Sequence, residues 1–294
     1  MTDDDVLAEV RRQWSPEVDA VEHLPVGFGA HHWAASSAGR RTHFLTLDAL
    51  GSRHSALSIE ASYATAATLA GDLDFVVAPL PSATGTFTAV LGSRVLSATS
   101  WLDGEPPESM DAETTAAMVA RLHAAAPPEG TPRWRPIVRE DLAEHLTTRC
   151  SAPWASGPYA ERARSALRAR LDAVAEWTAT YHVLAELARR RPWVVTHGEP
   201  DEGNQLLVDG RTLVLDWESV KLAPVERDLR TFVERGHSLP LGPLGATDPA
   251  MLELFDLEWR LDEIGQYAAW FGAPHAGTAS DRVAIGGLLH ELTR

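Results

Sequence analysis

Cysteine and lysine are the scarcest residues of this 294-residue sequence, which contains only Cys150 and Lys221. A single cysteine excludes an internal disulfide and the paired-cysteine spacings of zinc sites, and it is typical of a reducing cytoplasm. A single lysine excludes any site that needs a lysine ammonium in the first two thirds of the chain. The other permanently cationic side chains are all arginines.

Positive charge and long apolar runs are also scarce. The formal net charge is −15, which argues against nucleic acid as a partner because its phosphates are bound by lysine and arginine. No apolar run approaches the ~20 residues of a membrane helix, and the acidic start MTDDDVLAEV lacks the pattern of a signal peptide. We therefore expect a cytoplasmic protein without nucleic acid or membrane as partners. The negative charge favours a cationic small-molecule substrate.

The first part of the chain has the pattern of a small β-rich lobe. After a helix and loop in residues 1–20, the run HFLTL mixes apolar and β-compatible residues and follows the turn signal SSAGRR. SIEASYATAATLAG predicts a helix, and DFVVAPL, GTFTAVLG and RVLSATSWL predict three further strands. We expect residues 1–102 to form a largely antiparallel N-terminal lobe.

Beyond the Pro/Gly-rich connector DGEPPES, the pattern becomes mainly helical. MDAETTAAMVARLHAAAP predicts a helix, residues 163–191 predict one long helix, and PAMLELFDLEWRLDEIGQYAAWFG predicts a late one. The short strand-like runs WVVTHG, QLLV and TLVLDW lie between these helices. We expect residues 103–294 to form a larger, mainly helical C-terminal lobe, which makes the fold class α+β and bilobal.

The stretch THGEPDEGNQLLVDG, residues 196–210, places a histidine, acids and an asparagine at the ends of strand-like runs. The run TLVL follows and ends at Asp216. Side chains at neighbouring strand ends can converge, and carboxylates with an amide oxygen suit Mg²⁺, which keeps positions for phosphate and water. A nearby carboxylate can orient a hydroxyl nucleophile and accept its proton. These are the parts that phosphoryl transfer requires.

HGEPDEGN and LVLDW resemble the catalytic loop and metal-binding strand of the aminoglycoside phosphotransferase family, whose members have the protein-kinase-like fold. ERDL, ARLHAAAP and SWLDGEP are similar to further segments of that family, and the resemblance extends over about residues 20–270. It implies an enzyme that transfers the γ-phosphoryl of ATP or GTP, with Mg²⁺, to a small-molecule hydroxyl. The implied acceptor is an aminoglycoside or related cationic antibiotic, so that the reaction confers antibiotic resistance.

Carried over by position, the resemblance implies a role for individual residues. They are Glu199 as the catalytic carboxylate, Asn204 and Asp216 as metal ligands, Gly27 and Gly29 in the loop over the phosphates, Glu60, Trp101 and Leu102 as further nucleotide-binding residues, and His197 and Asp228 as structural support. The expected ligands of substrate ammonium groups are Asp201, Glu258 and Asp262.

The sequence departs from the family pattern at three positions. Glu199 stands where the family has aspartate, and the longer side chain displaces the carboxylate unless the backbone compensates or Asp201 shares its work. The strand lysine that contacts the nucleotide phosphates is absent, and Thr46 is its equivalent in HFLTL. Glu218 replaces a glycine, and either adds a carboxylate to the metal site or faces water. The cations that could replace the lysine are Arg40, Arg41, Arg53 and His43.

Other interpretations stay open or are disfavoured. A kinase-like protein that binds a nucleotide or metabolite without turnover is favoured by the first two departures, and a metabolic small-molecule kinase is the rival within the enzymes. GHSLP resembles the nucleophile elbow of hydrolases around Ser238, but its second glycine is a proline and no buried strand precedes it. We interpret His31 and His32 as loop or surface residues that can contact phosphate or substrate, rather than as ligands of one shared metal.

Overall fold

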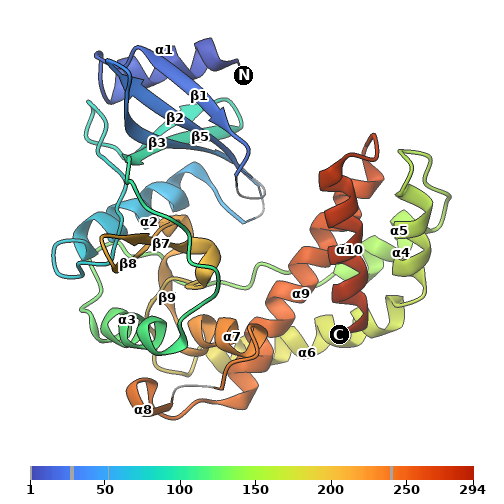
Figure 1. Cartoon of the computed structure of the whole chain (residues 1–294). Coiled ribbons are helices and arrows are strands. Elements are labelled where there is room, and N and C mark those ends of the chain that lie inside the picture. The colour runs from blue at the N-terminus through green and yellow to red at the C-terminus, as the bar shows by residue number, and fades with distance from the viewer. Residues whose placement is uncertain (1, 27–29, 52, 239–240) are drawn as a thin grey trace. The chain divides into compact units, whose positions relative to one another are not determined.

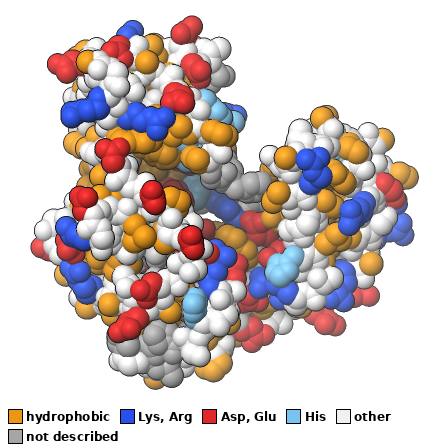
Figure 2. All heavy atoms as spheres, viewed as in Figure 1, with side chains coloured by type: hydrophobic (Ala, Val, Ile, Leu, Met, Phe, Trp, Pro, Cys, Tyr) orange, Lys and Arg blue, Asp and Glu red, His pale blue; other side chains and the backbone are white. Residues whose placement is uncertain are grey.

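The computed structural model describes residues 2–26, 30–51, 53–238 and 241–294. The chain divides into two compact units, of which the first comprises Met1–Trp134 with Pro192–Ala246 and the second Arg135–Arg191 with Thr247–Arg294. The lobe boundary expected between Leu102 and Asp103 stays a prediction. On the face drawn in Figure 2, acidic and basic side chains are both spread among hydrophobic ones. No helix within the described ranges has the length and apolar character to cross a membrane.

The first unit begins with a five-stranded antiparallel sheet in the strand order β1-β2-β3-β5-β4 (Figure 1). Its strands and the two helices near it are α1 (Asp3–Gln13), β1 (Ala20–Leu24), β2 (His31–Ser37), β3 (Arg40–Ala49), α2 (Ala56–Leu69), β4 (Thr88–Leu91) and β5 (Arg94–Ser100). The strands predicted at HFLTL, GTFTAVLG and RVLSATSWL and their antiparallel arrangement are therefore confirmed. The SSAGRR turn joins β2 to β3 through Ala38 and Gly39, whose φ angles are 51° and 75°.

The alternation of β3 decides which of its side chains reach the candidate site. Leu45 and Leu47 point into a core with Val6 and Val10 of α1 and are at most 1% exposed. Successive side chains of a strand point to opposite faces. Thr46 therefore faces the other side of the sheet, where it lines the cavity described below.

One predicted strand is wrong. In DFVVAPL, Val76 makes only an isolated parallel bridge to Val214, and no named strand of the described chain includes it. Pro79 and Pro81 flank the end of this run, and proline cannot donate a ladder hydrogen bond. The segment instead runs as a connector whose Leu80 N–H donates to the Ala98 carbonyl of β5 at 2.7 Å.

The rest of the first unit carries the central stretch on short ribbons. Its elements are α3 (Ala112–Ala124), β6 (Val194–Thr196), the 3₁₀ turn η1 (Glu202–Asn204), β7 (Gln205–Val208), β8 (Arg211–Val214), the 3₁₀ turn η2 (Trp217–Ser219), β9 (Lys221–Ala223), α7 (Glu226–Glu234) and α8 (Leu241–Leu244). β6 pairs with β9, and β7 pairs with β8, both antiparallel. The predicted strands at WVVTHG, QLLV and TLVLDW are confirmed. Trp217, 1% exposed, anchors the core beneath them.

The second unit is helical. Its helices are α4 (Leu142–Cys150), α5 (Ala160–Arg168), α6 (Leu171–Ala188), α9 (Pro249–Gly272) and α10 (Ala279–Thr293). The predicted late helix is confirmed by α9, whereas the single long helix predicted over residues 163–191 is wrong because α5 ends before α6 begins. Arg170, at the break, leaves the helical conformation with φ −125° and donates to the Leu292 carbonyl of α10 at 2.7 Å.

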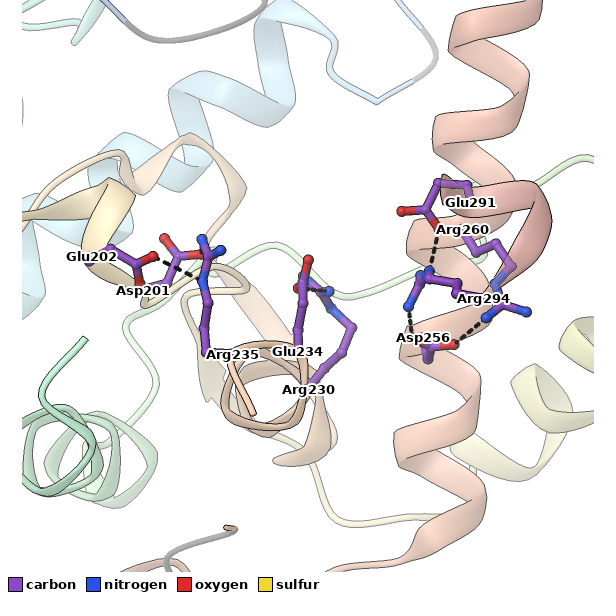
Figure 3. A network of polar contacts seen from close by, with 9 residues as sticks. All are labelled: Asp201, Glu202, Arg230, Glu234, Arg235, Asp256, Arg260, Glu291 and Arg294. Atoms are coloured by element: carbon purple, nitrogen blue, oxygen red, sulfur yellow. Dashed lines mark hydrogen bonds and ion pairs between the residues drawn. The ribbon is translucent and has the colours of Figure 1, made fainter. Parts of the chain in front are cut away.

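Ion pairs fasten α9 to the end of α10 within this second unit. Arg294 contacts Asp256 at 2.6 Å and Glu291 at 2.5 Å, as the right part of Figure 3 shows. Arg260 approaches the same Asp256 carboxylate at 3.6 Å. The late acidic helix is therefore not uniformly solvated, because part of its charge is neutralised by arginines of the same unit.

Candidate active site

His197 fixes the loop that follows β6. Its ring is 1% exposed, its Nε2 donates to the Leu215 carbonyl at 2.8 Å, and its Nδ1 accepts from the Glu199 N–H at 3.3 Å. These two contacts define a neutral imidazole protonated at Nε2, and burial lowers the pKa of His197 accordingly. The ring also packs edge-on against Trp217 with centroids 4.7 Å apart. His197 therefore ties the loop to the residue that precedes Asp216.

Asp228 of α7 holds the same loop from its other side. Its carboxylate is fully buried and accepts the backbone N–H groups of Gly198 at 2.5 Å and His197 at 3.2 Å. His123 of α3 lies 2.9 Å from its Oδ2. Burial opposes the charge, yet the hydrogen bond and charge of His123, with those of neighbouring cations, bring the pKa of Asp228 below its ordinary value. Asp228 thus contacts the loop directly, and its role as structural support for catalysis stays a prediction.

Arg227 forms a clamp that the sequence did not reveal. Its guanidinium donates to Thr196 Oγ1 at 2.9 Å and to the Ser219 carbonyl at 3.1 Å, so it joins β6 to η2. Gly198 lies against it with φ +108°, and a Cβ at Gly198 would come 2.3 Å from Arg227 Nη2. The glycine of the HGE motif is therefore required both by its backbone conformation and by the guanidinium beside it.

Asn204 and Asp201 shape the turn that follows Glu199. The Asn204 amide donates from Nδ2 to the Glu199 carbonyl at 2.9 Å, which leaves Oδ1 as the atom available to a cation. Asp201 accepts from the Gly203 N–H at 3.0 Å and pairs with Arg235 at 2.7 Å, as Figure 3 shows. The Asp201 carboxylate thus holds η1 in place. Its role as a substrate ligand stays a prediction.

Asp216 lies in an unusual backbone conformation. Its φ of 64° and ψ of 59° are left-handed, which non-glycine residues rarely adopt and which clusters at functional sites. The backbone of the preceding Leu215 donates to the Asn204 carbonyl at 2.8 Å. The two predicted metal ligands are therefore brought together by one main-chain hydrogen bond, and both line the same cavity.

Two further carboxyl groups crowd Asp216. Glu218 does not simply face water, because its Oε2 is buried without a hydrogen-bond partner. Burial and the charge of Asp216 raise the pKa of Glu218 well above its ordinary value. Asp48 of β3 also has a buried, unpartnered oxygen, and burial followed by the charge of Asp216 raises its pKa to about 7. Acidic groups are thus crowded around Asp216, where a bound cation would favour their ionised forms.

The electrostatic setting of Glu199 suits a proton acceptor. Burial, together with the charges of Asp216 and Asp201, raises its pKa, while Arg230 and Arg53 act in the opposite direction. A carboxylate with a raised pKa binds a proton more readily than an exposed one and remains ionised near neutrality when the rise is moderate. Figure 3 shows that Arg230 is itself paired with Glu234 on α7.

A cavity of about 360 Å³ opens between the sheet and these ribbons within the first unit. Its apolar wall includes Phe44, Trp101, Leu102, Leu206 and Leu215. Its polar wall includes His32, Thr46, Asn204 and Asp216. This combination of an apolar slot and a few convergent polar groups is typical of a small-molecule site. Trp101 and Leu102, expected near a purine, both line it.

The connector after β5 is held close to β7. Glu105 and Leu207 exchange backbone hydrogen bonds of 3.1 and 2.8 Å. A Cβ on Gly104 would come 2.6 Å from the Leu207 carbonyl, so only glycine fits there without a backbone shift. The DGEPPES connector is therefore a defined wall of the cavity and not a loose linker.

Glu60, another predicted nucleotide-binding residue, does not line this cavity. Glu60 of α2 accepts from the Phe87 N–H at 2.9 Å and from Thr88 Oγ1 at 2.6 Å, so its carboxylate fastens α2 to β4. The nucleotide-binding role of Glu60 stays a prediction, as do those of Gly27 and Gly29, which lie outside the described residues.

Glu258 and Asp262 lie on α9 in the second unit. Glu258 is 9% exposed and accepts the Tyr181 hydroxyl at 2.6 Å. Asp262 accepts from Gln266 at 2.8 Å, one turn along the same helix. Glu258 thus satisfies a buried tyrosine, whereas the Asp262 carboxylate belongs to the more accessible side of α9. Their roles as substrate ligands stay predictions.

Sequence reasoning missed several residues of the site. Arg227, Ser219 and Asp48 belong to it through interactions with residues distant in the sequence, which no local pattern signals. Ser219 Oγ donates to the His197 carbonyl at 2.8 Å. Both histidines lie on β2, where His31 is exposed, as the surface interpretation expects, whereas His32 lines the cavity. The register of β2 against β3 was the missing information.

The oxygen set around the cavity fits a hard cation completed by a ligand. Within the part of the chain that is described, no three His, Cys, Asp or Glu side chains are grouped to hold a metal by themselves. Asn204 and Asp216 offer one amide oxygen and one carboxylate to the cavity. Mg²⁺ is commonly held by one or two carboxylates together with substrate phosphates and water. The residues present therefore fit Mg²⁺ in company with a nucleotide.

Comparison with known proteins agrees with this geometry. The phosphotransferase enzyme family matches residues 21–258. Protein StrN of Streptomyces griseus is 30% identical over 230 residues, which make up 70% of this chain and 68% of StrN.

Solved structures share the fold. Spectinomycin phosphotransferase APH(9)-Ia, in complex with ADP and spectinomycin, has a TM-score of 0.73 at 13% identity over 99% of this chain and 94% of that one. A microcompartment-associated aminopropanol kinase has a TM-score of 0.57 at 15% identity over 99% and 95%. At such identities the similarity shows the fold alone, and the expected α+β, protein-kinase-like fold is confirmed.

Proposed function

The chain belongs to the phosphotransferase enzyme family of small-molecule kinases, and we propose that it transfers the γ-phosphoryl of ATP or GTP to a hydroxyl of a cationic antibiotic. The observation that carries the proposal is the pairing of Asn204 and Asp216 on the wall of an apolar cavity, beside the loop that bears Glu199. Family membership supports a hydroxyl acceptor. The nucleotide and the antibiotic are our proposal.

The cavity accounts for nucleotide binding in this proposal. Phe44, Trp101, Leu206 and Leu215 provide apolar surface for a purine, and backbone groups near Trp101 and Leu102 provide its hydrogen bonds. The structure similar in fold that contains ADP supports a nucleotide as co-substrate. The glycines at 27 and 29 would let backbone N–H groups approach the phosphates.

Asn204 and Asp216 are proposed to hold Mg²⁺ through Oδ1 and the carboxylate, respectively. When bound, Mg²⁺ neutralises phosphate charge and orients the transferred group. The left-handed backbone of Asp216 and the crowding by Glu218 and Asp48 cost free energy in the absence of a cation. These features support the binding of a cation beside Asp216.

Glu199 is proposed to orient the acceptor hydroxyl and take its proton. Its carboxylate stands on a loop fixed by His197, Asp228 and Arg227, so its position is constrained by three independent contacts. Such positioning matters because a misplacement on the order of 1 Å can cost ~100-fold in rate. The extra methylene of glutamate is accommodated in this proposal by the loop that carries it.

A cationic amino sugar or aminocyclitol is the acceptor we favour. The fold is shared with a spectinomycin phosphotransferase, and the net charge of −15 attracts cations. Asp201, Glu258 and Asp262 are proposed to meet substrate ammonium groups. A metabolic amino alcohol is the second acceptor to test, because an aminopropanol kinase shares the fold as well.

The test is direct. The full chain is incubated with Mg²⁺ and either ATP or GTP, together with spectinomycin, aminoglycosides, aminopropanol or choline. Phosphorylated product is followed by mass spectrometry and nucleoside diphosphate by a coupled assay. The proposal expects one phosphoryl group added to an antibiotic. Product formed only from an amino alcohol would contradict the antibiotic as acceptor and would favour a metabolic small-molecule kinase.

A nucleotide-binding protein without turnover is the candidate from another functional class. Its supporting observation is that none of the described residues lining the cavity is a lysine or an arginine. That reading predicts nucleotide binding with no product from any acceptor tested. It also predicts that Asp216→Ala leaves nucleotide affinity unchanged, since binding would then not depend on a metal.

A further inference from the structure

The cavity presents a charge problem for a nucleotide. Its described lining contains a carboxylate at Asp216 but no lysine and no arginine. Of the cations that the sequence offered as replacements, Arg41 pairs with Glu22 at 2.8 Å, and its guanidinium lies over the Trp101 ring at 4.7 Å from the centroid. Nucleotide phosphates carry several negative charges and are bound in proteins by charge-assisted hydrogen bonds. Among the described lining residues, only His32 can acquire a positive charge.

His32 is held in a defined orientation. It pairs in register with Thr46 across β2 and β3, and its Nδ1 lies 3.2 Å from Thr46 Oγ1. Its ring stacks on Phe44 with centroids 5.1 Å apart and planes at 28°. With Nδ1 on Thr46 and one ring face on Phe44, Nε2 is the nitrogen left to serve the cavity. This is a preorganised donor and not a loose surface histidine.

We infer that His32, protonated on nucleotide binding, donates from Nε2 to a phosphate of the nucleotide and provides the cation that the other described lining residues lack. Nδ1–H donates to Thr46 Oγ1 in this state, so both ring nitrogens are satisfied. The proton comes from solvent. The inference rests on the proposed function, because it requires a nucleotide in this cavity.

The charges around His32 explain why the proton arrives with the nucleotide. Burial lowers the pKa of His32, and its chain neighbour His31 on β2 and His23 on β1 oppose a positive charge as well. Among the described residues, the charge of Asp216 favours protonation. Tyr63, which lines the cavity from α2, has a pKa raised well above its ordinary value and stays neutral. A phosphate beside Nε2 raises the pKa of His32 in the complex above that in the free protein.

The sign of the pH dependence follows from this difference. A group that is more basic in the complex makes binding favourable at low pH, and this gain disappears as the pH rises through the pKa of the complex. Nucleotide affinity therefore falls from pH 6 to pH 8, by at most tenfold per pH unit for one proton. Adenosine, which has no phosphate, binds without this dependence.

The experiment uses isothermal titration calorimetry of the full chain with Mg-ADP and with adenosine, in two buffers of different ionisation enthalpy. The variants are His32→Gln, which keeps a hydrogen-bonding side chain but cannot be charged, and His31→Gln as the matched control. His31 lies on the same strand, but its side chain is exposed on the opposite face. The wild type and His31→Gln should take up protons with Mg-ADP, whereas His32→Gln should not.

His32→Gln should also bind Mg-ADP about tenfold more weakly, the factor for losing one charge-assisted hydrogen bond, and without pH dependence. Equal affinity and equal proton uptake in His32→Gln and wild type would overturn the inference and leave the proposed function intact. Binding of neither Mg-ADP nor adenosine to the wild type would overturn the proposed function itself. Ring NMR of His32 in the wild type gives a second readout, because its pKa must rise when Mg-ADP is added.

Discussion

The carboxylate of Asp228 accepts the backbone N–H of Gly198 at 2.5 Å although the two residues are 30 positions apart in the chain. The same carboxylate contacts His123, 105 positions away, at 2.9 Å. One buried group therefore joins α3, α7 and the loop that carries Glu199. We expect the activity of the candidate site to depend on Asp228 as much as on the residues that face the cavity.

Asp228→Asn is expected to destabilise the protein by about 2–4 kcal/mol, because the amide cannot accept all of these hydrogen bonds and leaves buried donors unpaired. Urea unfolding measures the loss. Asp74→Asn is the matched control, since the Asp74 carboxylate pairs with Arg121 and Arg211 at an exposed position and its loss should change stability far less. Equal effects of the two changes would contradict the role of Asp228.

Gly198→Ala is expected to lower activity at least tenfold and stability by about 1–3 kcal/mol. The φ of +108° strains any other residue, and the new Cβ would displace the Arg227 guanidinium from its clamp on β6 and η2. Gly210→Ala separates the two causes, because Gly210 has φ +75° with open space around its Cβ position. The control should lose stability but keep its turnover rate, and loss of activity in both would argue against the clamp.

Glu199→Gln is expected to reduce kcat by about 100- to 10,000-fold with little change in nucleotide affinity, because it removes a general base and not a binding group. A raised pKa keeps the carboxyl group protonated to higher pH, so kcat/KM of the wild type should rise with pH through a value above the ordinary 4.5 of glutamate. The pH dependence of kcat/KM measures this rise. A profile flat from pH 4 to pH 7 would assign proton transfer to another group.

Asp48→Asn is expected to stabilise the protein at alkaline pH. The folded-state pKa of Asp48 is raised from 3.8 to about 7, so its contribution to stability is fully present below 3.8 and is lost as the pH rises through about 7. The variant has no charge to bury, and its free energy of unfolding at pH 8 should exceed that of the wild type by on the order of 4 kcal/mol. The difference in Tm between Asp48→Asn and the wild type should shrink towards pH 4. A difference in Tm that does not change with pH would contradict a destabilising charge on buried Asp48.

The sequence predicted the local elements where patterning agreed with burial. β3 shows it well, because the alternation of Leu45 and Leu47 with Thr46 is read equally from the run HFLTL and from the packed sheet. The sequence pattern predicted two elements wrongly. In the DFVVAPL run, proline cannot donate ladder hydrogen bonds, and the run forms no named strand in the described chain. In the long helix, the hydrogen bond from Arg170 to α10 accompanies the break between α5 and α6.

The candidate site divides in the same way. Its motif residues, such as Asn204 and Asp216, lie close together in sequence and could be predicted from spacing and resemblance. Arg227 and His32 could not, because each acquires its position from a partner on another element of the fold. Glu258 is a further example. The acidic pattern of its helix does not reveal that the Glu258 carboxylate accepts a hydrogen bond from the buried Tyr181 hydroxyl.

The central claim is that Asp216 holds a metal ion for a bound nucleotide, and one measurement tests it most directly. Thermal unfolding of the wild type and of Asp216→Ala is recorded with ATP and with GTP, each with and without Mg²⁺. A ligand at 100 times its Kd stabilises by about 2.7 kcal/mol, which corresponds to a shift of a few degrees in Tm. We predict a Mg²⁺-dependent shift in the wild type that is absent in Asp216→Ala. An equal shift in both proteins, or none with either nucleotide, would contradict the account.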